Sequence, residues 1–144
     1  ATGTGLAPFL SIIRDPEIYD RFDRVVLTHG CRYTEELAYR ELITEHLPRH
    51  EYLGEAISEK LIYYPTVTRE QFANNGRLTD LLRSGRLAAD VKLPPVNTED
   101  DRFMICGSPA MLKETSALLD AQGFIEARHG DAGHYVVERA FVES

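Results

Sequence analysis

The chain has 144 residues, enough for one domain with a buried core, and its composition (43% hydrophobic, 27% charged) is ordinary for a globular protein. Its net charge of −7 argues against a general binder of nucleic acid or anionic membranes, because such proteins carry a basic face. The sequence also holds no apolar run long enough for a transmembrane helix and no secretory signal.

Extended and helical patterns alternate along the chain. Runs of β-branched and apolar residues predict strands, and apolar residues at helical spacing predict helices. In chain order, we expect a helix over Leu6–Arg14, a further turn of helix over Glu17–Phe22, a strand over Arg24–Gly30, a helix from Thr34 to Pro48, a strand over Lys60–Val67, a helix within Gly76–Gly85, a strand over Arg102–Cys106, a helix from Ser108 to Gly123, and a strand over His134–Phe141. The alternation predicts an α/β fold with a doubly wound parallel sheet of about five strands and helices on both faces.

The opening sequence ATGTGLAP has the features of a phosphate-binding loop. Gly3 and Gly5 allow a sharp turn and a close approach to a ligand, while Thr2 and Thr4 add hydroxyl groups. The free N–H groups of the helix that follows suit a diphosphate. A tight turn before a helix is the alternative, and Pro8 departs from the G-x-G-x-x-G pattern of dinucleotide-binding folds. Because such a loop follows a strand, we expect a strand before Thr2.

Three arginines lie at the carboxyl ends of predicted strands or just past them: Arg32, Arg69 and Arg77. Ligands of open α/β sheets bind at this edge. Guanidinium groups suit the 2′-phosphate of NADP, whereas NAD enzymes use an acidic residue for the ribose. The alternatives are solvated surface arginines, or local pairing of Arg69 with Glu70 and of Arg77 with Asp80.

Six short motifs follow one another along the chain: G-T-G-L-A-P, H-G-x-R, T-R-E, G-R, C-G-S-P and E-R-A-F. Together they resemble the NADP-binding domain of ferredoxin–NADP reductases of the bacterial type, from Thr2 to Ser144. The resemblance implies that residues 1–144 form an NADP(H)-binding domain, preceded in the complete protein by an FAD-binding β-barrel domain that this chain lacks. It implies hydride exchange between NADP(H) and FAD, electron transfer to ferredoxin or flavodoxin, and nucleotide binding without turnover by this domain alone.

The resemblance also assigns residues to parts of the cofactor. The diphosphate is expected at Thr2, Gly3, Thr4 and Gly5. The 2′-phosphate is expected where Arg32, Arg69 and Arg77 converge. The nicotinamide is expected beside the catalytic positions Cys106 and Glu138, with Gly107 and Ser108 also contacting the cofactor.

The end of the chain departs from the plant-type pattern of these reductases. Ala140 takes the place of the aromatic residue that stacks on the flavin in plant-type relatives, and Phe141 follows it within an extended tail. Both are expected near the cofactors. The residues by themselves leave alternatives: Cys106 as a small core residue, and Glu138 as a surface acid paired with Arg139.

Two other functions compete with this interpretation. One is the reductase domain of an oxygenase or a flavohaemoglobin-type protein, which shares the same nucleotide domain. The other is a non-catalytic nucleotide-binding module. The histidines show no zinc-binding spacing, so no metal site is expected. The two cysteines form no CxxC motif and favour a reducing compartment, so we expect a cytoplasmic protein. We also expect a monomer.

Overall fold

A computed structural model describes residues 1–2, 6–37, 39–128 and 132–138. Its helices and strands alternate as the sequence predicts. In chain order they are α1 (Ala7–Ile13), α2 (Pro16–Arg21), β1 (Val25–Cys31), the 3₁₀ turn η2 (Thr34–Glu36), the π-helical turn η3 (Leu42–His46), the 3₁₀ turn η4 (Leu47–Arg49), α3 (Gly54–Lys60), β2 (Leu61–Val67), α4 (Leu78–Arg83), α5 (Arg86–Asp90), β3 (Phe103–Cys106), α6 (Pro109–Ala121) and β4 (Tyr135–Glu138).

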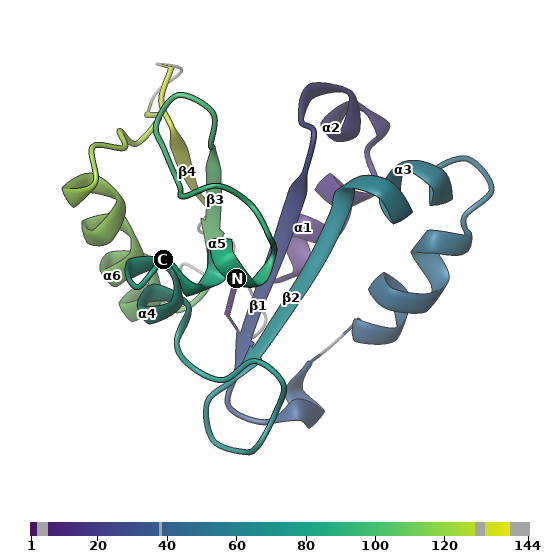
Figure 1. Ribbon diagram of the computed structural model, residues 1–144, viewed down its shortest axis with the longest axis horizontal. Coiled ribbons are helices and arrows are strands. Elements are labelled where there is room, and N and C mark those ends of the chain that lie inside the picture. The colour runs from purple at the N-terminus through teal and green to yellow at the C-terminus, as the bar shows by residue number, and fades with distance from the viewer. Residues whose placement is uncertain (3–5, 38, 129–131, 139–144) are drawn as a thin grey trace, which may run out of the picture.

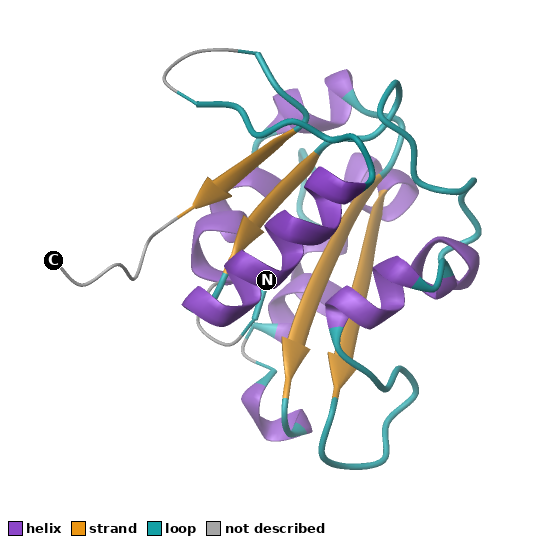
Figure 2. Cartoon of the chain, turned by 90° about the vertical axis from the view of Figure 1, so that its left-hand side faces the viewer, coloured by secondary structure: helices purple, strands orange, loops and turns teal. Residues whose placement is uncertain are grey.

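The strands pair in parallel, which confirms the α/β class. β1 pairs with β2 and β3 pairs with β4, in two separate two-stranded sheets. The residues Ala1 and Thr2 lie between the two pairs. The Gly30 N–H donates to the Ala1 carbonyl oxygen at 2.8 Å, and the Thr2 N–H donates to the Cys106 carbonyl oxygen at 3.2 Å. Figure 2 shows the four strands pointing in one direction, so their carboxyl ends face the same edge of the molecule.

Helices cover both sides of the strands. Figure 1 shows α4 and α6 on one side, and α1, α2 and α3 on the other. Each side has its own apolar cluster. One contains Leu6, Phe9, Leu10, Ile13, Leu27 and Ile57, and the other contains Leu78, Ile105, Met111, Leu119, Phe124 and Tyr135. These two clusters pack against the strands, and loops follow the carboxyl ends of the strands.

Local signals at the helix ends are confirmed where a side chain or a glycine marks the end. Ser108 caps α6, since its hydroxyl oxygen accepts a hydrogen bond from the Met111 N–H at 3.2 Å. Gly85 follows α4 with a φ of +79°, a left-handed conformation that favours glycine. The turn predicted after Asp15 is α2, whose cap is the Asp15 carboxylate accepting from the Glu17 N–H.

The continuous helix predicted from Thr34 to Pro48 is wrong. The structure has the short turn η2 and, after a break, a second helical segment that begins at residue 40 and in which η3 runs directly into η4. Leu37 leaves the helical region with a ψ of 74°, and Tyr39 adopts a left-handed φ of +63°. A right-handed helix cannot pass through a left-handed residue, so the apolar spacing alone was misleading.

Two helices were not predicted, α3 and α5. Neither begins with a side-chain cap, so the sequence carries no start signal. Gly54 opens α3 where a Cβ would lie 2.4 Å from the Pro48 carbonyl oxygen, which explains why this position has no side chain. The predicted last strand is confirmed over Tyr135–Glu138; His134 lies just before it, and residues 139–141 lie outside the described residues.

Candidate functional site

The loops at the carboxyl ends of the strands carry most of the predicted site residues. Arg32 follows β1, and Arg69 lies two residues beyond β2. Their backbones continue the pairing of the two strands: the Thr68 N–H donates to the Cys31 carbonyl oxygen at 3.1 Å, and the Arg69 N–H donates to the Arg32 carbonyl oxygen at 2.9 Å. The structure therefore brings two of the three predicted arginines next to each other.

Both of these arginines are exposed, and neither side chain forms an ion pair within the described part of the chain. The predicted alternative, pairing of Arg69 with Glu70, is not what the structure has. Instead the Glu70 carboxylate accepts a hydrogen bond from the Thr34 N–H, which joins the loop after β2 to the loop after β1. This contact holds the pKa of Glu70 below its ordinary value. Two cationic side chains thus stand on a loop pair that backbone contacts hold together.

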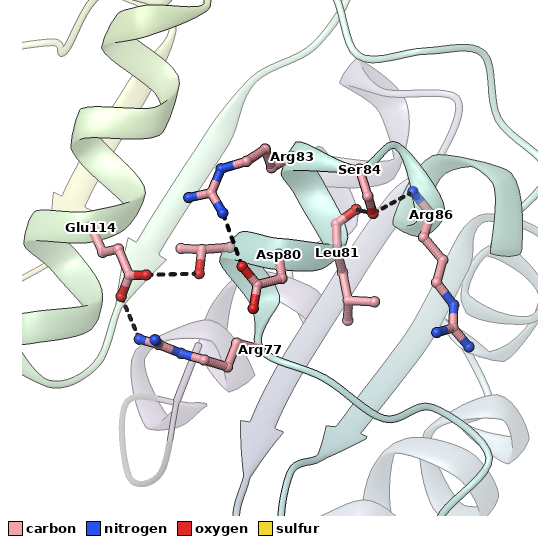
Figure 3. Close-up of polar contacts among 8 residues, drawn as sticks. Arg77, Asp80, Leu81, Arg83, Ser84, Arg86 and Glu114 are labelled. Atoms are coloured by element: carbon pink, nitrogen blue, oxygen red, sulfur yellow. Dashed lines mark hydrogen bonds and ion pairs between the residues drawn. The ribbon is translucent and has the colours of Figure 1, made fainter.

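Arg77 has a different environment. The predicted alternative partner, Asp80, pairs with Arg83 at 2.9 Å. Arg77 forms its ion pair with Glu114 of α6, as Figure 3 shows. The Thr79 hydroxyl donates to the other Glu114 oxygen at 3.3 Å. Sequence reasoning missed Glu114, because no spacing rule relates positions that are 37 residues apart.

Thr2 and the start of α6 are in contact. The Ser108 N–H donates to the Thr2 hydroxyl oxygen at 3.3 Å. A Cβ on Gly107 would lie 2.1 Å from that oxygen and 3.2 Å from the Thr2 nitrogen. Thr2 therefore lies so close to position 107 that only glycine fits there.

The two predicted catalytic residues lie side by side. Cys106 and Glu138 are register partners at the ends of β3 and β4. Cys106 has 0% of its surface exposed and belongs to the same apolar cluster as Leu6 and Phe9, as the core alternative predicts. Glu138 is exposed, and no ion pair involves it among the residues that the structure describes.

Several predicted positions fall outside the described residues: Gly3, Thr4, Gly5, Ala140 and Phe141. Within the described ranges, one group of side chains lies close enough to share an ion, formed by Glu41, Glu45 and His46. All three are exposed, on η3 or directly before it, and exposed acidic groups of this kind are common without a metal. No helix of the described chain is both long and apolar enough to cross a membrane.

Comparison with known proteins defines the family. The sequence model of the oxidoreductase NAD-binding domain matches residues 1–117. The chain belongs to the oxidoreductase NAD-binding domain family. It is 64% identical to a ferredoxin–NADP reductase of Azotobacter vinelandii over 144 residues, covering 99% of this chain and 56% of that protein. It is 61% identical to a ferredoxin–NADP reductase of Pseudomonas aeruginosa with the same coverage of both chains.

The fold of this NAD-binding domain is similar to a solved one. A crystal structure of a ferredoxin NADP⁺ reductase from Neisseria gonorrhoeae with bound FAD and NADP matches 95% of this chain and 52% of that chain. The TM-score is 0.81, at 32% sequence identity. The chain spans about half the length of these two ferredoxin–NADP reductases.

Proposed function

We propose that this NAD-binding domain binds NADP(H) and serves as the nucleotide half of a ferredoxin–NADP reductase. The single observation that carries the proposal is the adjacent placement of Arg32 and Arg69 at the carboxyl ends of β1 and β2. Identity of 64% and 61% to two ferredoxin–NADP reductases over nearly the whole chain supports the same conclusion.

Arg32 and Arg69 fit the 2′-phosphate of NADP. Both guanidinium groups are exposed and have no acidic partner in the described chain, so their N–H groups can donate several hydrogen bonds to the dianionic phosphate. No carboxylate takes the position at the end of β1 or β2 that NAD enzymes use for the ribose hydroxyl, since Arg32 and Thr68 follow these strands. We propose that Arg77 supplies a third donor.

We propose that Ala1 and Thr2 belong to a central strand, which makes one doubly wound sheet of five parallel strands from the two described pairs. Their hydrogen bonds to β1 on one side and to Cys106 of β3 on the other support this order. Residues 3–5 connect this strand to α1 and lie outside the described residues; we propose that Gly3, Thr4 and Gly5 bind the diphosphate, next to Thr2, which contacts the start of α6.

We propose that an FAD-binding β-barrel domain precedes this segment in the complete protein and that the nicotinamide lies beside the ends of β3 and β4. Bound NADPH supplies the hydride for a flavin there. Cys106 and Gly107 would shape the pocket, Ser108 would hold the α6 end, and Glu138 would contribute a charged group. Ala140 and Phe141 would lie near the flavin. Electrons would pass on to ferredoxin or flavodoxin.

The cellular setting belongs to the proposal as well. Cys31 and Cys106 form no disulfide in the structure, which is usual in a reducing compartment, so we propose a cytoplasmic protein. We propose a monomer that binds no nucleic acid, in keeping with the net charge of −7.

Calorimetric titration of the chain with NADP⁺ and NAD⁺ tests the nucleotide part. We expect tighter binding of NADP⁺, and a loss of about tenfold or more of that affinity in Arg69→Ala, because a charge-assisted phosphate contact disappears. Arg24→Ala is the matched control, since Arg24 is exposed at the opposite end of β1. Equal affinity for both nucleotides would overturn the choice of NADP. For the complete protein, absence of NADPH-dependent dye reduction would favour a non-catalytic nucleotide-binding module.

A further inference from the structure

We infer that Glu114 is a positioning residue for Arg77, which holds its guanidinium group in the nucleotide-free domain and competes for it with the nucleotide phosphate. Glu114 would thereby set how strongly the domain prefers NADP⁺ to NAD⁺. The inference rests on the proposed function, because it requires Arg77 to contact the 2′-phosphate.

The two oxygens of Glu114 are engaged differently. One accepts the Thr79 hydroxyl at 3.3 Å, and Thr79 is buried, with 3% of its surface exposed. The other accepts Nη2 of Arg77. The Glu114 side chain is 33% exposed and the Arg77 side chain 60%. The carboxylate is therefore the anchored member of the pair, and the guanidinium is the member free to turn.

The ion pair leaves most of the guanidinium available. The recorded contact uses Nη2 only, while an arginine side chain offers five N–H donors. Within the described residues, Arg77 makes no other side-chain hydrogen bond. A phosphate can thus approach the remaining donors, but the neighbouring carboxylate repels the dianion and lowers the cation's net attraction for it. Glu114 keeps Arg77 in place at a cost in phosphate affinity.

Nucleotide titration of Glu114→Gln tests this directly. The amide oxygen can still accept the hydrogen bond from Arg77, and the amide NH2 can donate to the Thr79 hydroxyl oxygen, but the negative charge is gone. We expect the Kd for NADP⁺ to fall by about twofold to fivefold, the range that corresponds to an exposed ion pair. The Kd for NAD⁺ should stay the same, since NAD⁺ lacks the 2′-phosphate. A merely structural role would change both dissociation constants together.

Asp80→Asn is the matched control. Asp80 lies on the same helix as Thr79 and pairs with Arg83 at 2.9 Å, not with Arg77. Figure 3 shows Arg83 directed toward Asp80 and Arg77 directed toward Glu114. Asp80→Asn changes the net charge by the same amount as Glu114→Gln. If Asp80→Asn changes the Kd for NADP⁺ less than Glu114→Gln does, the effect comes from the local contact with Arg77 and not from the change in net charge. Glu114→Ala, at a half-buried helix position, is a second variant with the same expected direction.

The double variant Arg77→Ala/Glu114→Gln decides between the inference and the function on which it rests. If Glu114 acts through Arg77, its effect on NADP⁺ binding disappears in the Arg77→Ala background. An effect of Glu114→Gln that persists in the Arg77→Ala background overturns the inference alone. The inference alone is also overturned if Glu114→Gln has no effect while the parent chain prefers NADP⁺ and Arg77→Ala weakens NADP⁺ binding. A parent chain that binds neither nucleotide overturns the proposed function.

Discussion

The Arg69 backbone N–H donates a 2.9 Å hydrogen bond to the carbonyl oxygen of Arg32, so the main chain itself holds two cationic positions together. Neither side chain is needed to keep its neighbour in place. Substitutions at these positions therefore change the charge offered to a nucleotide and leave the loop geometry intact.

Arg32→Ala should weaken NADP⁺ binding to an extent similar to Arg69→Ala, by about 1.5–3 kcal/mol, because each removes one charge-assisted phosphate contact. Titration calorimetry gives the two dissociation constants. The affinity for NAD⁺ should be unchanged in both variants. A parallel loss of NAD⁺ affinity would place Arg32 at a part of the nucleotide other than the 2′-phosphate.

Glu70→Ala should release the loop after β1. The Glu70 carboxylate accepts from the Thr34 N–H, so its removal should speed hydrogen exchange at that amide by about twofold or more. Glu99→Ala, at an exposed acid in a distant loop, should leave the rate unchanged. The lowered pKa of Glu70 means that this contact contributes stability above the ordinary pKa of 4.5 and loses it as the pH falls through the lower folded-state value. Unaltered protection of Thr34 in Glu70→Ala would show that the contact does not persist in solution.

Gly107→Ala should destabilise the domain by about 1–3 kcal/mol, because the new methyl group must displace Thr2 from its place beside α6. Urea denaturation measures the change. Gly30→Ala is the control on the other side of Thr2, where an added Cβ lies 3.5 Å from the Thr2 methyl carbon and makes ordinary contact. Gly107→Ala should cost clearly more than Gly30→Ala, and the reverse order would contradict the packing of Thr2.

Stability should fall in alkaline solution. Burial, followed by hydrogen bonds to Asp120 and Asp90, raises the pKa values of Tyr135 and Tyr64 to about 12. The unfolded tyrosines ionise near pH 10, so the folded state keeps protons that the unfolded state loses. The stabilisation is complete below pH 10 and disappears as the pH rises toward 12.

Denaturant titrations at several values of pH check this expectation. Tyr135→Phe should lower stability at neutral pH by about 1 kcal/mol and flatten the decline above pH 10, because one titrating group is removed. Tyr52→Phe, at a side chain with 82% of its surface exposed, is the matched control and should leave the slope unchanged. An equal slope in Tyr135→Phe and the parent chain would contradict the role of Tyr135.

Both thiols should resist modification in the native domain. Cys106 has 0% and Cys31 8% of its surface exposed, so a reagent reaches them only when the structure opens. A chromogenic thiol reagent should label the native chain slowly and both cysteines promptly in denaturant. The variant Cys106→Ser keeps only Cys31, and Cys31→Ser keeps only Cys106. Fast labelling of Cys106→Ser alone would show that Cys31 is accessible, whereas slow labelling of both variants would confirm that both thiols are buried.

The amino-acid sequence by itself determined the order and kind of most elements, because these depend on neighbours in the chain. The runs of β-branched and apolar residues became β1, β2 and β3, Ser108 became the N-cap of α6, and Gly85 took a left-handed conformation after Ser84, the C-cap of α4. The positions of Arg32 and Arg69 after strands also follow from the sequence, since residues that end parallel strands share one edge of a sheet.

Only the tertiary structure decided which groups meet. Glu114 reaches Arg77 across 37 residues, and Glu70 reaches Thr34 across 36, although nearer charged groups were available to Arg77 and Glu70. The break at Tyr39 likewise overrides a helical apolar pattern. Hydrogen bonds and ion pairs act over a few ångströms of space, and the packing of α4 against α6 and of the two strand-end loops sets those distances.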